Sequence, residues 1–317
     1  MSKKPILLVS GSLAYDRIMN FPGRFRDHIV PQKIHLLNLS FAVPDLHEHF
    51  GGTAGNIAYS LSLLGLRSEI IGAVGRDFSD YRAWLRRHGV GISGVRLVAG
   101  DRTAAAYIIT DADDNQITGF HIGAMHARGV PPSSALLARA AGAIVAPGNV
   151  TDMVALPGSY RRAQVRYWVD PGQQLTSLSG AQLRQALGGA YGLVANDYEH
   201  ALVARKTGWT AAEISARVHV VVTTLGPKGS VIRQGNTRWR IPPAKPKRVA
   251  DPTGAGDAYR AGLLYGWLRN WPWPAVGRLA ATVAAYTVER DGTQTHRFTW
   301  REVTARYRRA FGSRVPS

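Results

Sequence analysis

The chain has 317 residues, 45% of them hydrophobic, and its 39 Lys and Arg against 21 Asp and Glu give a formal net charge of +18. This length can bury the core of one large α/β domain or two smaller ones, and no apolar stretch approaches the ~20 residues that a membrane-spanning helix needs. The absence of cysteine excludes disulfides, thiolate metal sites and thiol catalysis.

The strong positive charge raises the possibility of a nucleic-acid partner. The basic residues are scattered, however, and no helix-turn-helix, zinc or RNP-like pattern accompanies them. The densest cluster lies near the C-terminus, at Arg301, Arg306, Arg308, Arg309 and Arg314. We therefore predict no specific nucleic-acid partner and no membrane partner, and we interpret the charge as solvated surface that attracts anionic nucleotides.

Apolar, largely β-branched runs predict strands in chain order at 6–9, 68–74, 143–146, 165–170, 192–195 and 218–224. Helical patterns separate them at 55–64, 79–88, 133–141, 180–187, 198–206 and 211–217. Such alternation predicts an α/β fold with a central, mostly parallel sheet and helices on both faces. Ligands of these folds bind at the carboxyl ends of the strands.

Residues 17–50 and 92–121 interrupt this alternation. Both ranges show short alternating stretches and little helical period, so we expect strands of a small separate sheet. Two ordinary long loops are the alternative, but structureless loops beyond ~12–15 residues are uncommon without a function. We therefore treat 1–317 as a single domain that carries a small sheet formed by these insertions.

The most informative string is the heptapeptide from Asp251 to Asp257, which precedes an apolar run predicted to be helical at 258–268. Gly254, Ala255 and Gly256 would place nearly uncovered backbone N–H groups at the start of that helix, where they can bind an anion. Asp257 could then take the proton of a hydroxyl that attacks a phosphorus held there. We expect the helix N-terminus to keep Asp257 ionised, and hence a weak base. An ordinary Gly-rich turn is the alternative.

Three further motifs accompany this string. The segment 51–56, Gly-Gly-Thr-Ala-Gly-Asn, opens a predicted helix, and 224–229 reads Thr-Leu-Gly-Pro-Lys-Gly. Asn196 and Glu199 are spaced to share one face of a helix, although the same pair could simply form a capping box. The segment 224–229 could likewise be an ordinary hairpin turn.

These four motifs, taken in their order along the chain, resemble those of the PfkB, or ribokinase-like, family of sugar and nucleoside kinases over roughly residues 5–300. Segments 21–25, 170–175, 206–209 and 292–294 look like the bacterial adenosine-kinase branch. The resemblance implies that Asp257 is the catalytic base and that Gly254, Ala255 and Gly256 form the anion hole. It also implies that the inserted segments form a lid over the substrate, through which two subunits often pair.

The resemblance further implies where the ligands bind. ATP would contact Asn196, Thr224, Gly226, Lys228 and Gly229. Glu199 would organise hydrated Mg²⁺, which usually keeps several waters. Asp16, with Gly52 and Asn56, would hold the sugar hydroxyls, and Ser12 lies on the same side. Positions around the base would be Ser40, Tyr107, Phe120, Gln173 and Gln174.

The two aromatic residues among these positions could stack on a purine, although an aromatic residue on a strand often belongs to the core instead. No arginine follows Gln174-Leu175, where the resembled branch would have one, and this weakens the argument for strict adenosine preference.

The resulting hypothesis is a cytoplasmic, Mg²⁺-dependent kinase of purine salvage. It would transfer the γ-phosphoryl group of ATP to the 5′-hydroxyl of a nucleoside, with adenosine giving AMP as the first expectation. A homodimer formed through the lid is a further expectation. A ribokinase- or fructokinase-type sugar kinase is the alternative enzyme, and a non-catalytic nucleotide-binding protein is the alternative outside enzymes.

Overall fold

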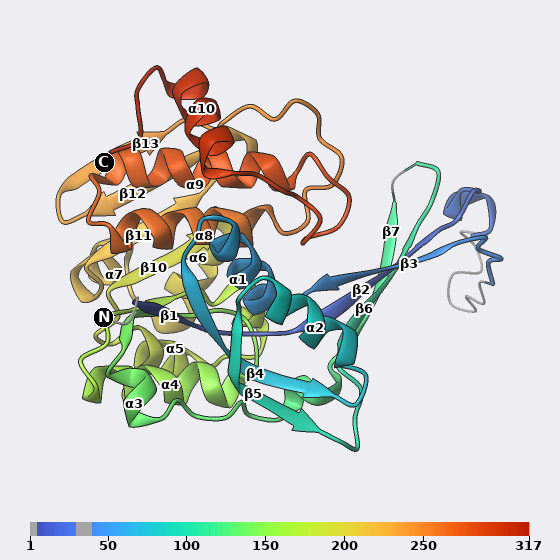
Figure 1. Cartoon of the computed structure of the whole chain (residues 1–317), viewed down its shortest axis with the longest axis horizontal. Coiled ribbons are helices and arrows are strands. Elements are labelled where there is room, and N and C mark those ends of the chain that lie inside the picture. The colour runs from blue at the N-terminus through green and yellow to red at the C-terminus, as the bar shows by residue number, and fades with distance from the viewer. Residues whose placement is uncertain (1–4, 30–39, 114, 317) are drawn as a thin grey trace.

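The computed structural model describes residues 5–29, 40–113 and 115–316. A nine-stranded sheet runs through the large body of the molecule in the order β13-β12-β11-β10-β9-β8-β1-β4-β5 (Figure 1). Neighbouring strands from β11 to β5 are parallel, while β12 and β13 extend the sheet as an antiparallel hairpin. In chain order the strands are β1 Ile6–Ser10, β4 Arg67–Gly75, β5 Gly91–Val98, β8 Ala140–Val145, β9 Tyr167–Val169, β10 Gly192–Asn196, β11 Val220–Thr224, β12 Ser230–Gln234 and β13 Thr237–Ile241.

Helices cover both faces of this sheet, as the alternation predicts. Strand β1 shows why, because Leu7 and Val9 enter one core while Leu8 enters the other. The first core also takes side chains from α1 Thr53–Leu63, α2 Ser79–Arg87, α8 Ala255–Leu268, α9 Trp273–Thr287 and α10 Trp300–Phe311. The second takes them from α4 Val150–Arg162, α5 Gly180–Leu187, α6 Asp197–Thr207 and α7 Ala211–Arg217.

The predicted helix at 133–141 is largely wrong. Only the short α3 Ser134–Leu137 forms there, and Ala140 already begins β8. Alanine-rich sequence suits a helix in isolation, but β8 lies between β1 and β9 and its last residues are fully buried in the sheet. Tertiary context therefore overrides the local propensity.

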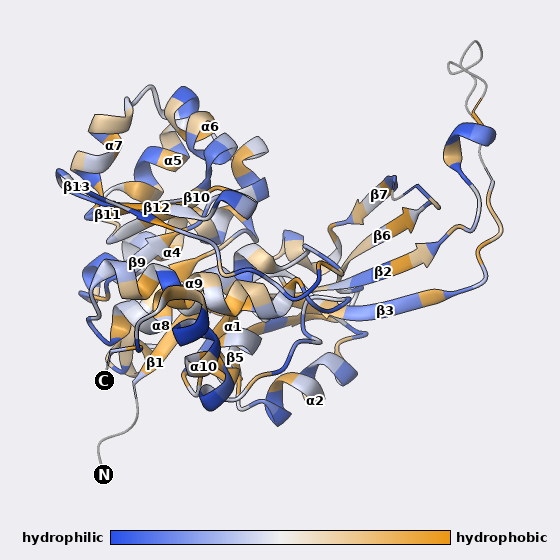
Figure 2. Ribbon diagram, turned by 90° about the horizontal axis from the view of Figure 1, so that it is seen from above, coloured by the Kyte–Doolittle hydropathy of each residue, from blue (hydrophilic) through white to orange (hydrophobic). Residues whose placement is uncertain are grey.

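The small sheet stands off the body as an arm in two perpendicular views (Figures 1 and 2). Its order is β3-β2-β6-β7, with β2 and β6 parallel and the outer pairs antiparallel. The strands are β2 Ala14–Asn20, β3 Leu46–Gly51, β6 Ala104–Thr110 and β7 Gln116–His121. Of the range 92–121 expected in this sheet, the first part instead lies in β5, which pairs with β4 in the large sheet.

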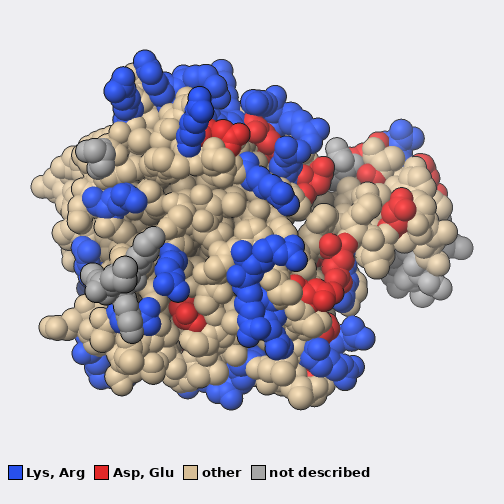
Figure 3. All heavy atoms as spheres, viewed as in Figure 1, with Lys and Arg blue, Asp and Glu red and all other residues tan. Residues whose placement is uncertain are grey.

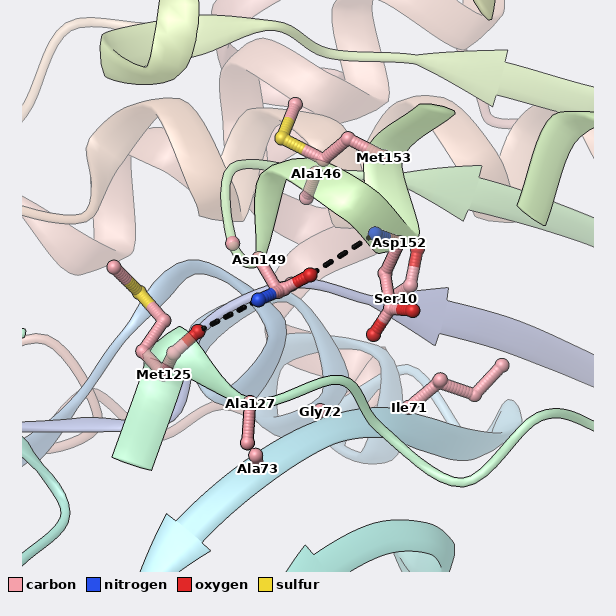
Figure 4. A pocket seen from close by; sticks show the side chains of 12 residues that line it. Ser10, Ile71, Gly72, Ala73, Met125, Ala127, Ala146, Asn149, Asp152 and Met153 are labelled. Carbon is pink, nitrogen blue, oxygen red and sulfur yellow. Dashed lines mark hydrogen bonds between the residues drawn. The ribbon is translucent and has the colours of Figure 1, made fainter. Parts of the chain in front are cut away.

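The return from the arm to the body is fastened at the start of α4 (Figure 4). The Asn149 side chain caps α4 by accepting the Asp152 N–H at 3.1 Å, and its Nδ2 donates to the carbonyl oxygen of Met125 at 3.1 Å. Asp152 accepts from the Gly129 N–H at 2.6 Å. The neighbouring cavity measures about 10 Å³, so it has room for one water at most. It is a packing gap at the base of the arm.

Basic side chains are spread over the face shown in Figure 3, with several gathered along its upper edge and acidic groups among them. One arginine of the C-terminal cluster departs from the solvated surface that we expected. Arg306 is buried and its guanidinium pairs with Glu289, with Nη1 3.0 Å from Oε2. Within the described ranges, no helix combines the length and the apolar character that crossing a membrane requires.

Candidate active site

A cavity of about 670 Å³ opens where the carboxyl ends of the parallel strands face the arm. Its floor comes from the first turns of α1 and α8, one side from the loops after β9, β10 and β11, and the opposite wall from β6 and β7. Charged groups in the lining are Asp16, Asp170, Glu199, Asp257 and Arg260. The cavity therefore lies where the strand alternation predicted a ligand.

The anion cradle forms at the start of α8, but with fewer free donors than expected. Gly254 is the N-cap in the left-handed region, at φ 75°, and it lines the cavity together with Gly256. The N–H of Ala255 donates to the Pro252 carbonyl oxygen at 3.2 Å, and Ala255 does not line the cavity. Residues in a first helical turn have no acceptor within the helix, so the two glycines remain the main donors.

Asp257 lies at the cavity floor beside this cradle. Asn56 Nδ2 on α1 donates to its Oδ2 at 2.9 Å. Burial raises the pKa of Asp257 to about 6, the Arg260 charge and the Asn56 bond act against the rise, and Asp16 adds to it. The expectation that the helix N-terminus holds this carboxylate at a low pKa is therefore wrong, because burial outweighs the helix. A pKa near neutrality makes Asp257 a better base than the sequence suggested.

A buried relay fixes the orientation of Asn56. Gln294 Nε2 donates to Asn56 Oδ1 at 3.1 Å and to the Tyr81 hydroxyl at 2.6 Å, and Trp84 Nε1 donates to Gln294 Oε1 at 3.0 Å. These bonds leave the Asn56 amide nitrogen to point at Asp257. A Cβ on Gly55 would lie 1.8 Å from the Tyr81 hydroxyl, so this helix start tolerates no side chain there.

On the acceptor side, Asp16 of β2 reaches the cavity where β3 meets α1. A Cβ on Gly51 would lie 2.3 Å from its Oδ2, and Gly52 adopts φ 84° with no space for a Cβ beside the Ser12 carbonyl oxygen. The glycine pair thus lets the carboxylate approach the start of α1. Burial raises the pKa of Asp16 to about 6, and Asp251 adds to the rise.

Ser12 also lines the cavity, yet its hydroxyl is already engaged. Its oxygen accepts the Thr53 N–H at 3.0 Å and lies 3.2 Å from Thr53 Oγ1. Ser12 therefore closes the first turn of α1, and the neighbouring Asp16 carries the acceptor capacity on this side.

On the arm wall of the cavity, the lining residues within β6 and β7 are Ala106, Ile108 and Phe120, and Ile122 follows β7. Ala106 pairs with Phe120 across β6 and β7, so both face the same side. Tyr107 consequently faces the other side, where its hydroxyl accepts from Arg17 Nη1 at 2.5 Å. The expectation that Tyr107 stacks on a base is therefore corrected.

Ser40 also departs from expectation, because it is exposed in the loop before β3 and does not line the cavity. Gln173 and Gln174 do line it, from the short 3₁₀-helix η4 Gly172–Thr176. Phe120 is 49% exposed.

On the nucleotide side, Asn196 and Glu199 form the capping box and also line the cavity. Asn196 N–H donates to Glu199 Oε2 at 2.8 Å, and Glu199 N–H donates to Asn196 Oδ1 at 2.7 Å. Thr224 lines the cavity at the end of β11. Gly226, Lys228 and Gly229 follow outside the lining, around the 3₁₀-helix η5 Gly226–Lys228, with φ of 56° at Gly226 and 87° at Gly229.

Among the described residues, no group of three or more His, Cys, Asp and Glu could hold a metal ion by itself. Glu199 uses Oε2 for the helix cap, and Oε1 remains for another partner. One carboxylate combined with waters and phosphate oxygens is the usual donor set for Mg²⁺ at phosphoryl-transfer sites, so this arrangement fits that ion.

Sequence reasoning missed two buried members of the site. Asp170 lies just beyond the end of β9, and Arg260 lies inside α8, where it pairs with Asp170. The available signal was a lone arginine within the apolar run 258–268. A charged side chain in an otherwise apolar, buried helix is rarely found without a charged partner or a ligand.

Known proteins resemble this chain over nearly its whole length. The family model described as pfkB family carbohydrate kinase matches residues 13–300. A nucleoside kinase from Methanothermobacter thermautotrophicus is 33% identical, with 100% of each chain covered. The structure of Burkholderia thailandensis nucleoside kinase in complex with inosine is 41% identical, with a TM-score of 0.85, and the match covers 98% of this chain and 100% of that one. The structure of the same enzyme in complex with ADP-inosine is 42% identical, with a TM-score of 0.83, and the match covers 98% of each chain.

Proposed function

This chain belongs to the pfkB family of carbohydrate kinases, and we propose that it is a nucleoside kinase that transfers the γ-phosphoryl group of ATP to a 5′-hydroxyl. Adenosine is the first expected acceptor, with AMP as product. The named relatives support nucleosides as the acceptor class, since the Methanothermobacter protein is called a nucleoside kinase and the Burkholderia structures contain inosine.

One observation carries this proposal. Asp257, Asn56 and the glycine cradle meet Asp16 within a single cavity, with a partly apolar wall opposite them. A sugar held by Asp16 through paired hydroxyls would direct its 5′-oxygen toward Asp257 and the cradle. The base of the nucleoside would then lie toward Phe120 and the two glutamines.

The chemistry follows from this placement. The 5′-oxygen attacks the γ-phosphorus, the bond between that phosphorus and the β,γ-bridging oxygen breaks, and Asp257 accepts the hydroxyl proton. Gly254 and Gly256 N–H groups stabilise charge on the transferred group. Glu199 is the residue that would hold hydrated Mg²⁺, which supplies charge neutralisation for the phosphates when bound. Asn196, Thr224 and the turn 226–229 would contact the rest of ATP.

The base side is suited to purines without strict discrimination. Phe120 offers an aromatic face, and the Gln173 and Gln174 amides can each donate and accept. A 6-amino and a 6-oxo purine can both pair with such amides, so we expect inosine to be accepted as well. We place the reaction in purine salvage in the cytoplasm, where ATP is supplied.

A coupled ADP-release assay with adenosine, inosine, cytidine, ribose and fructose tests this function. We expect adenosine to exceed ribose by at least ~10²-fold in kcat/KM, because the base adds stacking and polar contacts. Ribose or fructose performing as well as adenosine would make the protein a sugar kinase. If none of these acceptors supports ADP release, the nucleoside kinase proposal is overturned.

We further propose that a second copy of this chain covers part of the arm. Leu46 on the edge strand β3 is 60% exposed and Ile117 on the edge strand β7 is 45% exposed, which leaves apolar side chains in solvent at both edges. Light scattering should give the mass of a dimer for the wild type and a lower mass for Leu46→Lys. A monomeric wild type at high concentration would reject this pairing.

A further inference from the structure

Arg260 is a buried cation on the helix that forms the anion cradle. The residue is 7% exposed and its partner Asp170 is 1% exposed. Arg260 Nη2 donates to Asp170 Oδ1 at 2.8 Å, while Nε faces Asp170 Oδ2 in the same ion pair. Burial acts to lower the pKa of Arg260, but Asp170, Asp257 and Glu199 together raise it, so the guanidinium stays charged. This two-point pairing fixes the plane of the guanidinium.

The remaining nitrogen, Nη1, points toward the cradle. A Cβ built on Gly256 would lie only 2.8 Å from it, and Gly256 itself lines the cavity. A helical side chain runs back over the preceding turn, which explains how a residue further along α8 reaches the cradle. Within the described part of the chain, Nη1 has no hydrogen-bond partner. Arg260 lines the cavity, so this unpaired, charged N–H is free to donate to an anion held at the cradle.

The charge balance of the cavity points the same way. Among the described residues that line it are four carboxylates, those of Asp16, Asp170, Glu199 and Asp257, and one Lys or Arg, which is Arg260. A phosphoryl group carries further negative charge, which such a lining would repel. A fixed cation beside the glycine donors offsets that repulsion where negative charge accumulates during transfer.

We propose that Arg260 is a catalytic residue whose Nη1 donates a hydrogen bond to a non-bridging oxygen of the γ-phosphoryl group during transfer, with Asp170 as its positioning residue. The inference rests on the proposed kinase function. Arg260 keeps its protons throughout: the 5′-oxygen bonds to phosphorus, the bond to the β,γ-bridging oxygen breaks, and the proton passes to Asp257. The helix that supplies the backbone donors therefore also supplies a side-chain cation from its next turn.

The test compares Arg260→Gln and Arg260→Lys with the wild type in steady-state kinetics with adenosine, ATP and Mg²⁺. We expect Arg260→Gln to lower kcat by ~10²-fold or more, as removal of a transition-state donor does. The KM for adenosine should change by less than ~3-fold, because the contact forms during transfer and not on nucleoside binding. The kcat of Arg260→Lys should lie between those of Arg260→Gln and the wild type, since lysine restores the positive charge but not the planar, two-point donor geometry of the guanidinium.

A binding measurement separates catalysis from structure. Calorimetry with adenosine and Mg²⁺ should show that Arg260→Gln binds ADP within ~3-fold of the wild type but loses most of the extra affinity for ADP with aluminium fluoride, which mimics the group in transfer. Equal losses for both probes would show that Arg260 only maintains the fold. Retention of more than a third of the wild-type kcat would also reject the proposal.

Arg306→Gln is the matched control, because it breaks the ion pair between the buried Arg306 on α10 and Glu289, and neither residue lines the cavity. It should lower thermal stability, since removing one partner of an ion pair leaves the other charge without compensation. It should leave kcat within ~2-fold of the wild type.

If Arg260→Gln does not fold, the double variant Arg260→Gln with Asp170→Asn removes both charges and answers the same question. A folded double variant with near wild-type kcat would overturn the proposal. A wild type without kinase activity on any nucleoside would instead reject the proposed function.

Discussion

The floor of the cavity and the arm above it are built in opposite ways. On the floor, Asn56, Asp170 and Arg260 are buried, and their side chains are tied to partners on other elements. On the arm, every residue of β7 is exposed, including Phe120, and the hydrogen bonds of the sheet hold the strands together. The floor is therefore preorganised for reaction, whereas the side chains of β7 on the arm wall are exposed to solvent.

This difference assigns separate tasks to the two regions. Phosphoryl transfer depends on donors and charges that need no rearrangement at the moment of reaction, and the floor supplies them. Selection of the acceptor's nucleobase depends on protein surface that becomes buried when a ligand fills the cavity, and the arm supplies that surface. Changes on the floor should therefore lower kcat, and changes on the arm should alter discrimination between acceptors.

The largest effect is expected from the floor. Asp257→Asn should lower kcat by ~10²-fold or more with little change in nucleoside affinity, because an amide cannot accept the hydroxyl proton. Steady-state kinetics combined with equilibrium binding of adenosine would measure both quantities. A variant that keeps more than a third of the wild-type kcat would remove Asp257 from the role of base.

The pH dependence of kcat/KM should reflect the ionisation of the carboxylates on the cavity floor. Burial raises the pKa of both Asp257 and Asp16 to about 6, so each is a carboxylate above that pH and becomes protonated as the pH falls through it. Because both must be ionised, kcat/KM at pH 5 should lie ~10²-fold below its plateau.

The limiting acid slope of that profile should approach two logarithmic units per pH unit, and Asp16→Asn should reduce it toward one. A profile that stays flat down to pH 5 would contradict the burial of these carboxylates.

The arm predicts a smaller effect with a built-in control. Phe120→Ala should raise the KM for adenosine by ~10-fold, since stacking on an aromatic side chain typically contributes ~1–3 kcal/mol. Tyr107→Ala, on the adjacent strand but facing away from the cavity, should leave that KM within ~2-fold, as surface substitutions usually do. Equal effects from the two variants would contradict the assignment of Phe120 to the cavity face of the arm and of Tyr107 to the opposite face.

The smallest effect concerns the nucleotide side. Glu199→Gln should raise the Mg²⁺ concentration for half-maximal rate by ~3- to 10-fold, because a neutral amide organises hydrated Mg²⁺ less well. Glutamine still serves in a capping box, so α6 should persist. Glu213→Gln is the matched control, since Glu213 caps α7 in the same way but is exposed and does not line the cavity. If Glu199→Gln leaves the Mg²⁺ dependence unchanged, Glu199 is only a helix cap.

The sequence predicted the fold class and the helix start at Gly254 because both depend on local patterns. Strand-helix alternation indicates a parallel sheet, and the glycines at 254 and 256 fix a helix start within one short string. Local patterns could not predict which face of the arm Tyr107 occupies. A strand has two faces, and nothing in β6 alone indicates which one meets a cavity.

Properties that depend on distant segments were also out of reach. The pKa of Asp257 depends on its burial and on partners that include Asn56, which is 201 positions away in the sequence. Arg260 was hidden within a run interpreted as apolar, and its pairing with Asp170 spans 90 positions. Such long-range neighbours require the three-dimensional structure.

The division of tasks between floor and arm is tested most directly by kcat/KM for adenosine and for ribose in the wild type and in Phe120→Ala. We expect the wild type to prefer adenosine by at least ~10²-fold in kcat/KM. We expect Phe120→Ala to lose ~10-fold in kcat/KM with adenosine while its value for ribose stays unchanged, because ribose does not reach the arm. Equal losses for both acceptors, or a wild type that uses ribose as well as adenosine, would contradict this division of tasks.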